Sequence, residues 1–193
     1  MLRKCFIRVG LAVVMACVTL VAQQSPAAAA PVKPLDINDP GAQWIEGHQS
    51  GKCINDPNNS LVDGTQMIIY HCKGFSNTSN EDWNFQVVDL VGSTYYYWIW
   101  NSESRKCLTV QGASTLDNAP IIQYTCNTGS NEEWSIPLNF TDGGGQNWRL
   151  IRARNSNKCV TVQNLSSLDG AKLLQYTCNS GDNQNWAVYP PPL

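Results

Sequence analysis

The chain has 193 residues, of which 15% are charged, 42% are hydrophobic and 8 are cysteines. An ordinary soluble domain is about 25% charged, so this chain is poor in charge. Its formal net charge of −2 excludes a strongly basic nucleic-acid-binding surface as the leading hypothesis. The length suits a single domain with an appended segment.

The first residues have the three-part pattern of a secretory signal peptide. A basic start is followed by an apolar or small stretch over residues 9–22 and by alanines at 27–29. We therefore expect a signal peptide over residues 1–29, cleaved after Ala29 or, as a second choice, after Ala30, and a secreted protein. The apolar stretch is too short for a mature membrane span. A lipid anchor on Cys17 is the alternative, although the apolar stretch continues past that residue.

Cleavage after residue 29 changes the properties of the working chain. Three of the 13 basic residues and none of the 15 acidic ones are removed, which leaves a formal charge of −5. Cys5 and Cys17 are also removed, so six cysteines remain in an oxidising compartment.

The rest of the chain divides into a lead-in, three units and a tail. Three prolines in residues 30–42 predict an extended lead-in. A single domain is expected over residues 43–190, and residues 191–193 form a tail. The units are expected at about 43–90, 95–138 and 147–190.

Cysteine spacing is the clearest repeat in these units. Each unit has two cysteines 19 residues apart, and successive units are offset by 54 and 52 residues. The pairs are Cys53 and Cys72, Cys107 and Cys126, and Cys159 and Cys178. Six cysteines allow 15 connectivities, and the equal gaps favour a disulfide within each unit. Structural zinc usually needs a close Cys-x-x-Cys pair, which the mature chain lacks, so we expect no metal site.

Other residues follow the same frame and predict the fold class. Each unit has an isoleucine before its first cysteine, a tyrosine before its second and a closing tryptophan. These residues are Ile45, Ile99 and Ile151, Tyr70, Tyr124 and Tyr176, and Trp83, Trp134 and Trp186. Runs such as residues 107–110 and 121–125 are rich in strand-forming residues, with an Asp-Asn turn between them. We therefore predict an all-β chain whose three units close into one barrel, with the isoleucines and closing tryptophans in its core.

The chain resembles the secreted bacterial ricin-type β-trefoil lectins over all three units. The resemblance rests on residues 158–162, 169–179 and 183–186, the last of which contain the Gln-x-Trp signature of the family. The other two units have Glu-x-Trp at residues 81–83 and 132–134. The resemblance implies a β-trefoil of three pseudo-symmetric repeats and a non-catalytic sugar-binding module with one shallow pocket per unit.

The family pocket uses an aspartate two residues after the first cysteine, an aromatic before the second, a polar residue after it, and Asn-Gln before the closing tryptophan. In the third unit the matching residues are Thr161, Tyr176, Asn179, Asn183 and Gln184. In the second they are Thr109, Tyr124, Asn127, Asn131 and Glu132. In the first they are Asn55, Tyr70, Lys73, Asn80 and Glu81. Gln184 is open to two interpretations, a sugar contact or a structural hydrogen-bond partner.

The family aspartate is missing from all three units. Two units have a threonine there, and the first has Asn55 with Asp56 beside it as a possible substitute. Because charge-assisted hydrogen bonds are roughly twice as strong as neutral ones, this departure weakens the expected sugar contacts.

We expect a secreted lectin that binds glycans or polysaccharide and needs no cofactor. The alternative, favoured by the missing aspartate, is a trefoil that binds protein, as a hydrolase inhibitor or a toxin or enzyme partner. An enzyme is not expected, because disulfides leave no thiol nucleophile and neither histidine has a recognisable catalytic partner.

Overall fold

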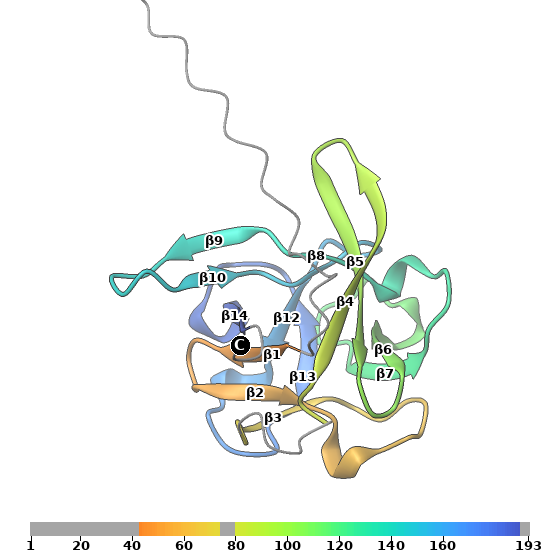
Figure 1. Cartoon of the computed structure of the whole chain (residues 1–193), viewed down its shortest axis with the longest axis horizontal. Coiled ribbons are helices and arrows are strands. Elements are labelled where there is room, and N and C mark those ends of the chain that lie inside the picture. The colour runs from red at the N-terminus through yellow and green to blue at the C-terminus, as the bar shows by residue number, and fades with distance from the viewer. Residues whose placement is uncertain (1–42, 74–79, 190–193) are drawn as a thin grey trace, which may run out of the picture. The chain divides into compact units, whose positions relative to one another are not determined.

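A computed structural model describes residues 43–73 and 80–189 of the chain (Figure 1). The predicted signal peptide over 1–29, the lead-in over 30–42 and the tail over 191–193 lie outside the described residues. Within them, no helix is both long enough and apolar enough to cross a membrane.

The described residues form strands joined by turns and five 3₁₀ segments of three residues each, so the all-β prediction is confirmed. The strands are β1 (Trp44–Gly47), β2 (Lys52–Asn55), β3 (Ile68–His71), β4 (Trp83–Val91), β5 (Thr94–Asn101), β6 (Lys106–Val110), β7 (Ile121–Thr125), β8 (Glu133–Ser135), β9 (Leu138–Thr141), β10 (Asn147–Arg149), β11 (Arg152–Ala153), β12 (Cys159–Val162), β13 (Leu173–Tyr176) and β14 (Trp186–Tyr189). The 3₁₀ segments are η1 (Pro57–Asn59), η2 (Gln111–Ala113), η3 (Ser130–Glu132), η4 (Gln163–Leu165) and η5 (Asp182–Gln184).

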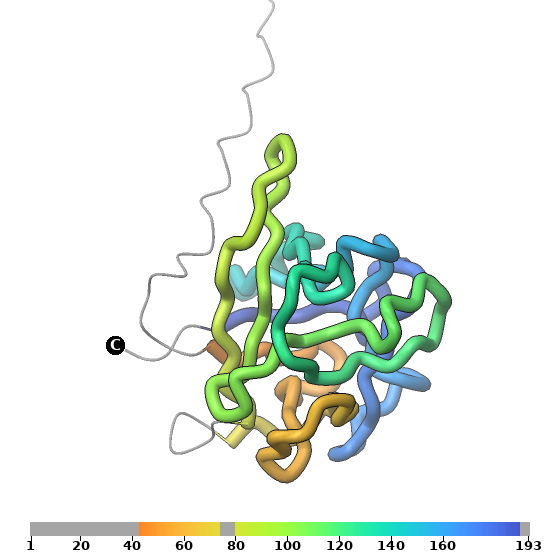
Figure 2. Tube along the Cα trace, turned by 90° about the vertical axis from the view of Figure 1, so that its right-hand side faces the viewer, coloured from red at the N-terminus to blue at the C-terminus, as the bar shows by residue number. Residues whose placement is uncertain are grey.

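Each unit contributes an equivalent hairpin. These hairpins are β2–β3, β6–β7 and β12–β13, all antiparallel. Isolated bridges join them in pairs, at Gln66 and Ile122, at Ile68 and Lys172, and at Pro120 and Leu174. The strands between the hairpins connect the units: β4 pairs with β5, β8 pairs with β11, and β14 pairs with β1. The longer β4–β5 hairpin extends beyond its neighbours in both views (Figure 1, Figure 2).

The repeated apolar residues form the core. The three closing tryptophans and the three repeated isoleucines all have 0% exposure, so their predicted core position is confirmed. Each indole nitrogen donates a hydrogen bond to the backbone carbonyl of the residue that directly follows the first cysteine of its unit. These pairs are Trp83 with Ile54, Trp134 with Leu108 and Trp186 with Val160, at 2.9, 2.9 and 3.1 Å. A large apolar side chain is thereby buried with its one polar atom satisfied.

The three disulfides connect the cysteines within each unit, as predicted from their spacing. Their Cα atoms are 5.1, 5.0 and 5.1 Å apart. Each bond joins the first strand of a hairpin to a cysteine one or two residues after its second strand. The disulfides therefore hold the start of the loop that leads to each predicted pocket.

Aspartates of the repeated turns link each unit to the next. Each accepts a hydrogen bond from a lysine at 2.6 Å and another from a backbone N–H at 2.8 or 2.9 Å. Asp63 contacts Lys106 and Thr125, Asp117 contacts Lys158 and Thr177, and Asp169 contacts Lys52 and His71. The lysine is in each case the main reason why the pKa of the aspartate lies below its ordinary value. The contacts form a ring that includes all three units.

Candidate functional site

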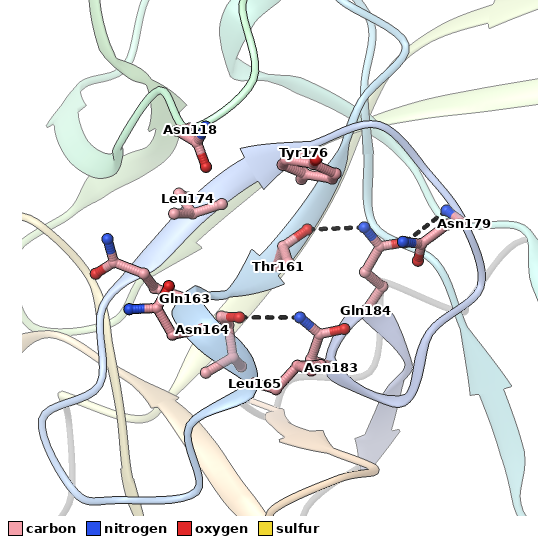
Figure 3. Close-up of a pocket in the computed structure, with 11 residues that line it drawn as sticks. Asn118, Thr161, Gln163, Asn164, Leu165, Leu174, Tyr176, Asn179, Asn183 and Gln184 are labelled. Atoms are coloured by element: carbon pink, nitrogen blue, oxygen red, sulfur yellow. Dashed lines mark hydrogen bonds between the residues drawn. The ribbon is translucent and has the colours of Figure 1, made fainter.

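The third unit brings its five predicted residues together around one pocket of about 250 Å³ (Figure 3). Thr161 comes from β12, Tyr176 ends β13, and the other three lie in or just before η5. The eleven lining residues are Asn118, Thr161, Val162, Gln163, Asn164, Leu165, Leu174, Tyr176, Asn179, Asn183 and Gln184. None of these side chains is charged, so the wall combines apolar atoms with neutral hydrogen-bonding groups.

Strand register and turn geometry place these side chains. Tyr176 lies opposite Cys159 in the β12–β13 pair, and alternation along β13 buries Gln175 and leaves Tyr176 39% exposed. The segment η4 forms part of the wall because Asn164 and Leu165 have left-handed φ values of 55° and 52°. Asparagine adopts this conformation more readily than most residues.

Gln184 braces the loop beneath the pocket. Its Nε2 donates to the Thr161 hydroxyl at 3.0 Å and to the Thr177 carbonyl at 3.1 Å, and its Oε1 accepts from the Asn179 N–H at 2.9 Å (Figure 3). The side chain has 0% exposure. Of the two interpretations of Gln184, this geometry favours the structural one, because both of its donors are already used.

Two asparagines retain polar capacity at the pocket. Asn179 accepts from the Gly181 N–H through its Oδ1, and Asn183 donates from its Nδ2 to the Val162 carbonyl at 2.9 Å. Within the described ranges, no protein group bonds the remaining Nδ2 of Asn179 or Oδ1 of Asn183. The pocket therefore offers one amide donor, one amide acceptor and the half-exposed ring of Tyr176.

The second unit uses its equivalent groups internally. The buried Glu132 carboxylate accepts from both the backbone N–H and the Nδ2 of Asn127, each at 2.7 Å. Burial raises the pKa of Glu132, while the bonds from Asn127 act in the opposite direction. Asn131 donates to the Val110 carbonyl at 3.0 Å, and Thr109 is buried. Tyr124 is 44% exposed, but the asparagine amide beside it is held by the carboxylate.

A lysine partly covers the corresponding aromatic in the first unit. The Lys73 ammonium lies 5.7 Å from the centre of the Tyr70 ring and 3.3 Å from the Asn80 Oδ1. The buried Glu81 accepts from the Asn55 Nδ2 at 2.9 Å and from the Lys73 N–H at 3.0 Å. A sugar stacking on Tyr70 therefore competes with a cation–π contact.

Asp56, the possible substitute for the missing family aspartate, is buried in the first unit. It has 0% exposure, and neither carboxylate oxygen has a hydrogen-bond partner within the described residues. The equivalent residues of the other units are Val110 and Val162, which belong to the hydrophobic core. Burial raises the pKa of Asp56 to about 7. The carboxyl group thus lies at a core position and does not face a sugar.

Sequence reasoning missed the contribution of the neighbouring unit to the pocket. Asn118 follows Asp117 in the second-unit turn, and its N–H donates to the Gln175 carbonyl at 2.9 Å. The signal that the sequence offered was the alignment of Asn118 with Gly64 and Gly170, because only the second unit has a side chain at this turn position. All three residues have a positive φ, which is 68° at Asn118. The pocket therefore lies at a seam between two units. No cluster of three or more potential metal ligands occurs in the described part of the chain.

Comparison with known proteins identifies relatives across the same region. The family model of the ricin-type beta-trefoil lectin domain matches residues 42–186. The designed threefold-symmetric protein ThreeFoil is 35% identical, with a TM-score of 0.65, over 77% of this chain and 98% of that one. An exo-beta-1,3-galactanase from Clostridium thermocellum is 26% identical, with a TM-score of 0.68, over 79% of this chain and 30% of that one.

One curated relative is Pierisin from Pieris brassicae, 27% identical over 140 residues, or 68% of this chain. The matched region spans only 16% of the length of Pierisin. Together these likenesses confirm the predicted β-trefoil of three pseudo-symmetric repeats.

Proposed function

Because the chain belongs to the ricin-type β-trefoil lectin domain family, we propose that it binds carbohydrate without catalysing a reaction, first of all in the third-unit pocket. The observation that carries the proposal is the convergence of five predicted residues on that pocket of about 250 Å³. The β12–β13 hairpin and the loop braced by Gln184 hold these residues in place, so the site is largely formed before a ligand arrives.

The chemistry of the pocket fits a neutral sugar. A pyranose has an apolar C–H face, which can lie on the half-exposed ring of Tyr176. Its hydroxyl groups can accept from the Asn179 Nδ2 and donate to the Asn183 Oδ1, the two amide groups with remaining capacity. Because the lining carries no charged side chain, we propose that the part of the ligand inside the pocket is uncharged.

The other two units are proposed as weaker sites. Asn127 is held by Glu132 in the second unit, and Lys73 lies over Tyr70 in the first. Binding there requires these internal contacts to be exchanged for sugar contacts. Weak additional sites still raise the avidity for a polysaccharide whose repeats can reach several of them.

We propose that the protein is secreted. The predicted signal peptide over residues 1–29 supports this location, and so do the three disulfides, which form and persist in oxidising compartments. The disulfides also occupy all six cysteines of the described residues, which supports a binding role over thiol catalysis.

A protein-binding trefoil is the second candidate. The observation that favours it is the internal satisfaction of both buried glutamates, Glu81 and Glu132, in two of the three units. On this hypothesis the sugar sites are vestigial, and the chain inhibits a hydrolase or accompanies a toxin or an enzyme.

A glycan array and a polysaccharide pull-down with the chain from Ala30 test the first proposal. Tyr176→Ala is expected to weaken binding of the selected glycan at least tenfold, with an unchanged unfolding midpoint. Tyr124→Ala removes the equivalent exposed tyrosine of the second unit, which we propose as a weaker site, and is expected to reduce binding less than Tyr176→Ala does. A folded protein that binds no glycan in either assay refutes the proposal. Co-purification of one protein, insensitive to competing sugar, selects the alternative.

A further inference from the structure

The third-unit pocket extends beyond the five residues that were predicted to bind a sugar. Asn179 and Gln184 lie at one end of it, and a second group of residues lies at the other (Figure 3). We call this second group the far end of the pocket; it consists of Asn118, Gln163, Asn164 and Leu174. A single sugar ring that bonds only the predicted residues does not use the far end.

The far end combines free amide groups with apolar surface. Within the described ranges, no protein group bonds the side-chain amides of Asn118, Gln163 or Asn164. Each amide offers two donor hydrogens and an acceptor oxygen to a ligand. Leu174 supplies apolar surface beside them, and so does Leu165, which is 62% exposed. This combination is the one that a neutral sugar ring requires.

The second unit lacks the asparagines of the far end. Asn118 reaches the third-unit pocket from the turn of the second unit. The equivalent residue that faces the second-unit hairpin is Gly64, whose N–H donates to the Gln123 carbonyl at 2.9 Å. Gly112 stands at the position of Asn164. The second unit therefore has no side-chain amide at either position.

The first unit has only one of the two asparagines. Asn58 stands at the position of Asn164 and has a similar φ of 60°. The residue that faces the first-unit hairpin is Gly170, whose N–H donates to the Ile69 carbonyl at 2.9 Å. An asparagine on both sides of the far end is thus specific to the third unit.

Backbone conformation and packing do not account for this difference. The φ values are 68° at Asn118, 86° at Gly64 and 84° at Gly170, a region that glycine and asparagine adopt more readily than other residues. A Cβ atom at Gly64 or Gly170 would have no heavy atom within 4 Å apart from its chain neighbours, so a side chain has room there. The side chain of Asn118 is therefore available for a ligand.

We propose that Asn118 and Asn164 bind a second sugar ring, so that the third-unit pocket recognises two linked neutral sugars. The first ring lies on Tyr176, and the second lies at the far end, where its hydroxyl groups exchange hydrogen bonds with the two asparagine amides. This inference rests on the proposed function and names its ligand class, a neutral glycan of at least two rings. It also makes Asn118 and Asn164 the residues that distinguish this pocket from the other two.

Calorimetric titrations of the chain from Ala30 with paired sugars test the proposal. The probes are galactose, glucose, xylose and mannose, each beside the β-linked disaccharide of the same sugar. At least one disaccharide is expected to bind about tenfold more tightly than its monosaccharide. Asn118→Gly is expected to abolish that preference without changing the affinity for the monosaccharide. Because Gly64 and Gly170 occupy the equivalent turns, the variant should keep its unfolding midpoint.

Asn157→Gly is the matched control. Asn157 is another exposed asparagine of the third unit, with a φ of 59°, and it does not line the pocket. This variant is expected to keep the full disaccharide preference. Equal loss of the preference in Asn157→Gly and Asn118→Gly overturns the proposal.

The outcomes separate this proposal from the proposed function. Binding that is lost in Tyr176→Ala but has the same disaccharide preference in Asn118→Gly and in the unsubstituted chain overturns the second subsite alone. Equal affinity of the unsubstituted chain for each monosaccharide and its disaccharide does the same. Binding of none of these probes also overturns the second subsite, and the glycan array then decides the proposed function separately.

NMR of the side-chain amides gives a second measurement. The Nδ2 signals of Asn118 and Asn164 should shift when the preferred disaccharide is added and stay in place with its monosaccharide, whereas the Asn179 signal should shift with both. Asn164→Gly should reduce the disaccharide preference as Asn118→Gly does, because Gly112 has nearly the same φ, 61° against 55°. Shifts that are confined to Asn179 with both sugars overturn the proposal.

Discussion

Replacing Asp56 by valine is expected to stabilise the protein and to remove one component of its pH dependence. Asp56 is fully buried, and within the described residues neither of its carboxylate oxygens has a hydrogen-bond partner. Val110 and Val162 occupy the equivalent positions of the other two units and belong to the core. The threefold repeat thus specifies the replacement, because the site has the surroundings of a valine.

The magnitude follows from the pKa. Burial raises the pKa of Asp56 from 3.8 to about 7 in the folded chain. The folded state therefore binds the proton more tightly than the unfolded state does. The stability that Asp56 contributes is fully present below pH 3.8 and is lost as the pH rises through about 7. A difference of about three pH units corresponds to about 4 kcal/mol in the free energy of unfolding.

Urea unfolding of both proteins between about pH 4 and pH 8 measures this effect. The stability advantage of Asp56→Val over the unsubstituted chain should grow with pH by about 4 kcal/mol. Other carboxylates with a raised pKa, such as Glu46 and Asp82, are present in both proteins and cancel in the comparison. Asp56→Asn is the matched control, since it removes the charge and keeps a polar group. A difference that stays constant with pH refutes the reasoning.

Three further predictions concern the contacts that repeat in all units. Asp117→Ala removes the acceptor of the Lys158 ammonium and should lower the unfolding midpoint at pH 7. Because the pKa of Asp117 is lowered in the folded state, its contribution to stability is lost as the pH falls, so the midpoints of the variant and the unsubstituted chain should converge in acid. Replacing both Cys107 and Cys126 by alanine, which opens a loop with a separation of 19 residues, should cost about 3 kcal/mol in denaturant unfolding. Trp134→Phe leaves the Leu108 carbonyl without its indole donor and should cost about 1–3 kcal/mol in the same assay, and an unchanged midpoint would contradict the assigned bond.

The repeat was readable from the sequence because it is a matter of spacing along the chain. Equal gaps between cysteines predicted the disulfide within each unit, since equal spacing implies equal geometry. Recurring tryptophans and isoleucines predicted the core, because a threefold barrel needs the same large apolar residue three times. Each of these predictions depends on contacts inside one unit or on symmetry between units.

The site was only partly predictable, because spacing along the chain does not show contacts that depend on loop closure or on a neighbouring unit. The matching positions of the third unit all line one pocket, but the hydrogen bonds of Gln184 depend on how its loop closes over the hairpin. Asn118 reaches the pocket from another unit, and spacing within the third unit carries no signal of it. Asp56 was a possible substitute for the missing family aspartate because it follows Asn55, whereas its side chain is fully buried in the structure.

By itself, the sequence determined an all-β trefoil of three disulfide-closed units with a tyrosine, asparagine and glutamine or glutamate at each expected pocket. Only the tertiary structure decided that the third unit keeps its asparagine amides available. In the second unit Glu132 binds the amide of Asn127, and in the first unit Lys73 lies over the ring of Tyr70. It also decided that aspartates of the turns join successive units in a ring. The physical reason is that hydrogen-bond satisfaction depends on the distance between groups in space, and distances across a seam or a closed loop are not encoded by spacing along the chain.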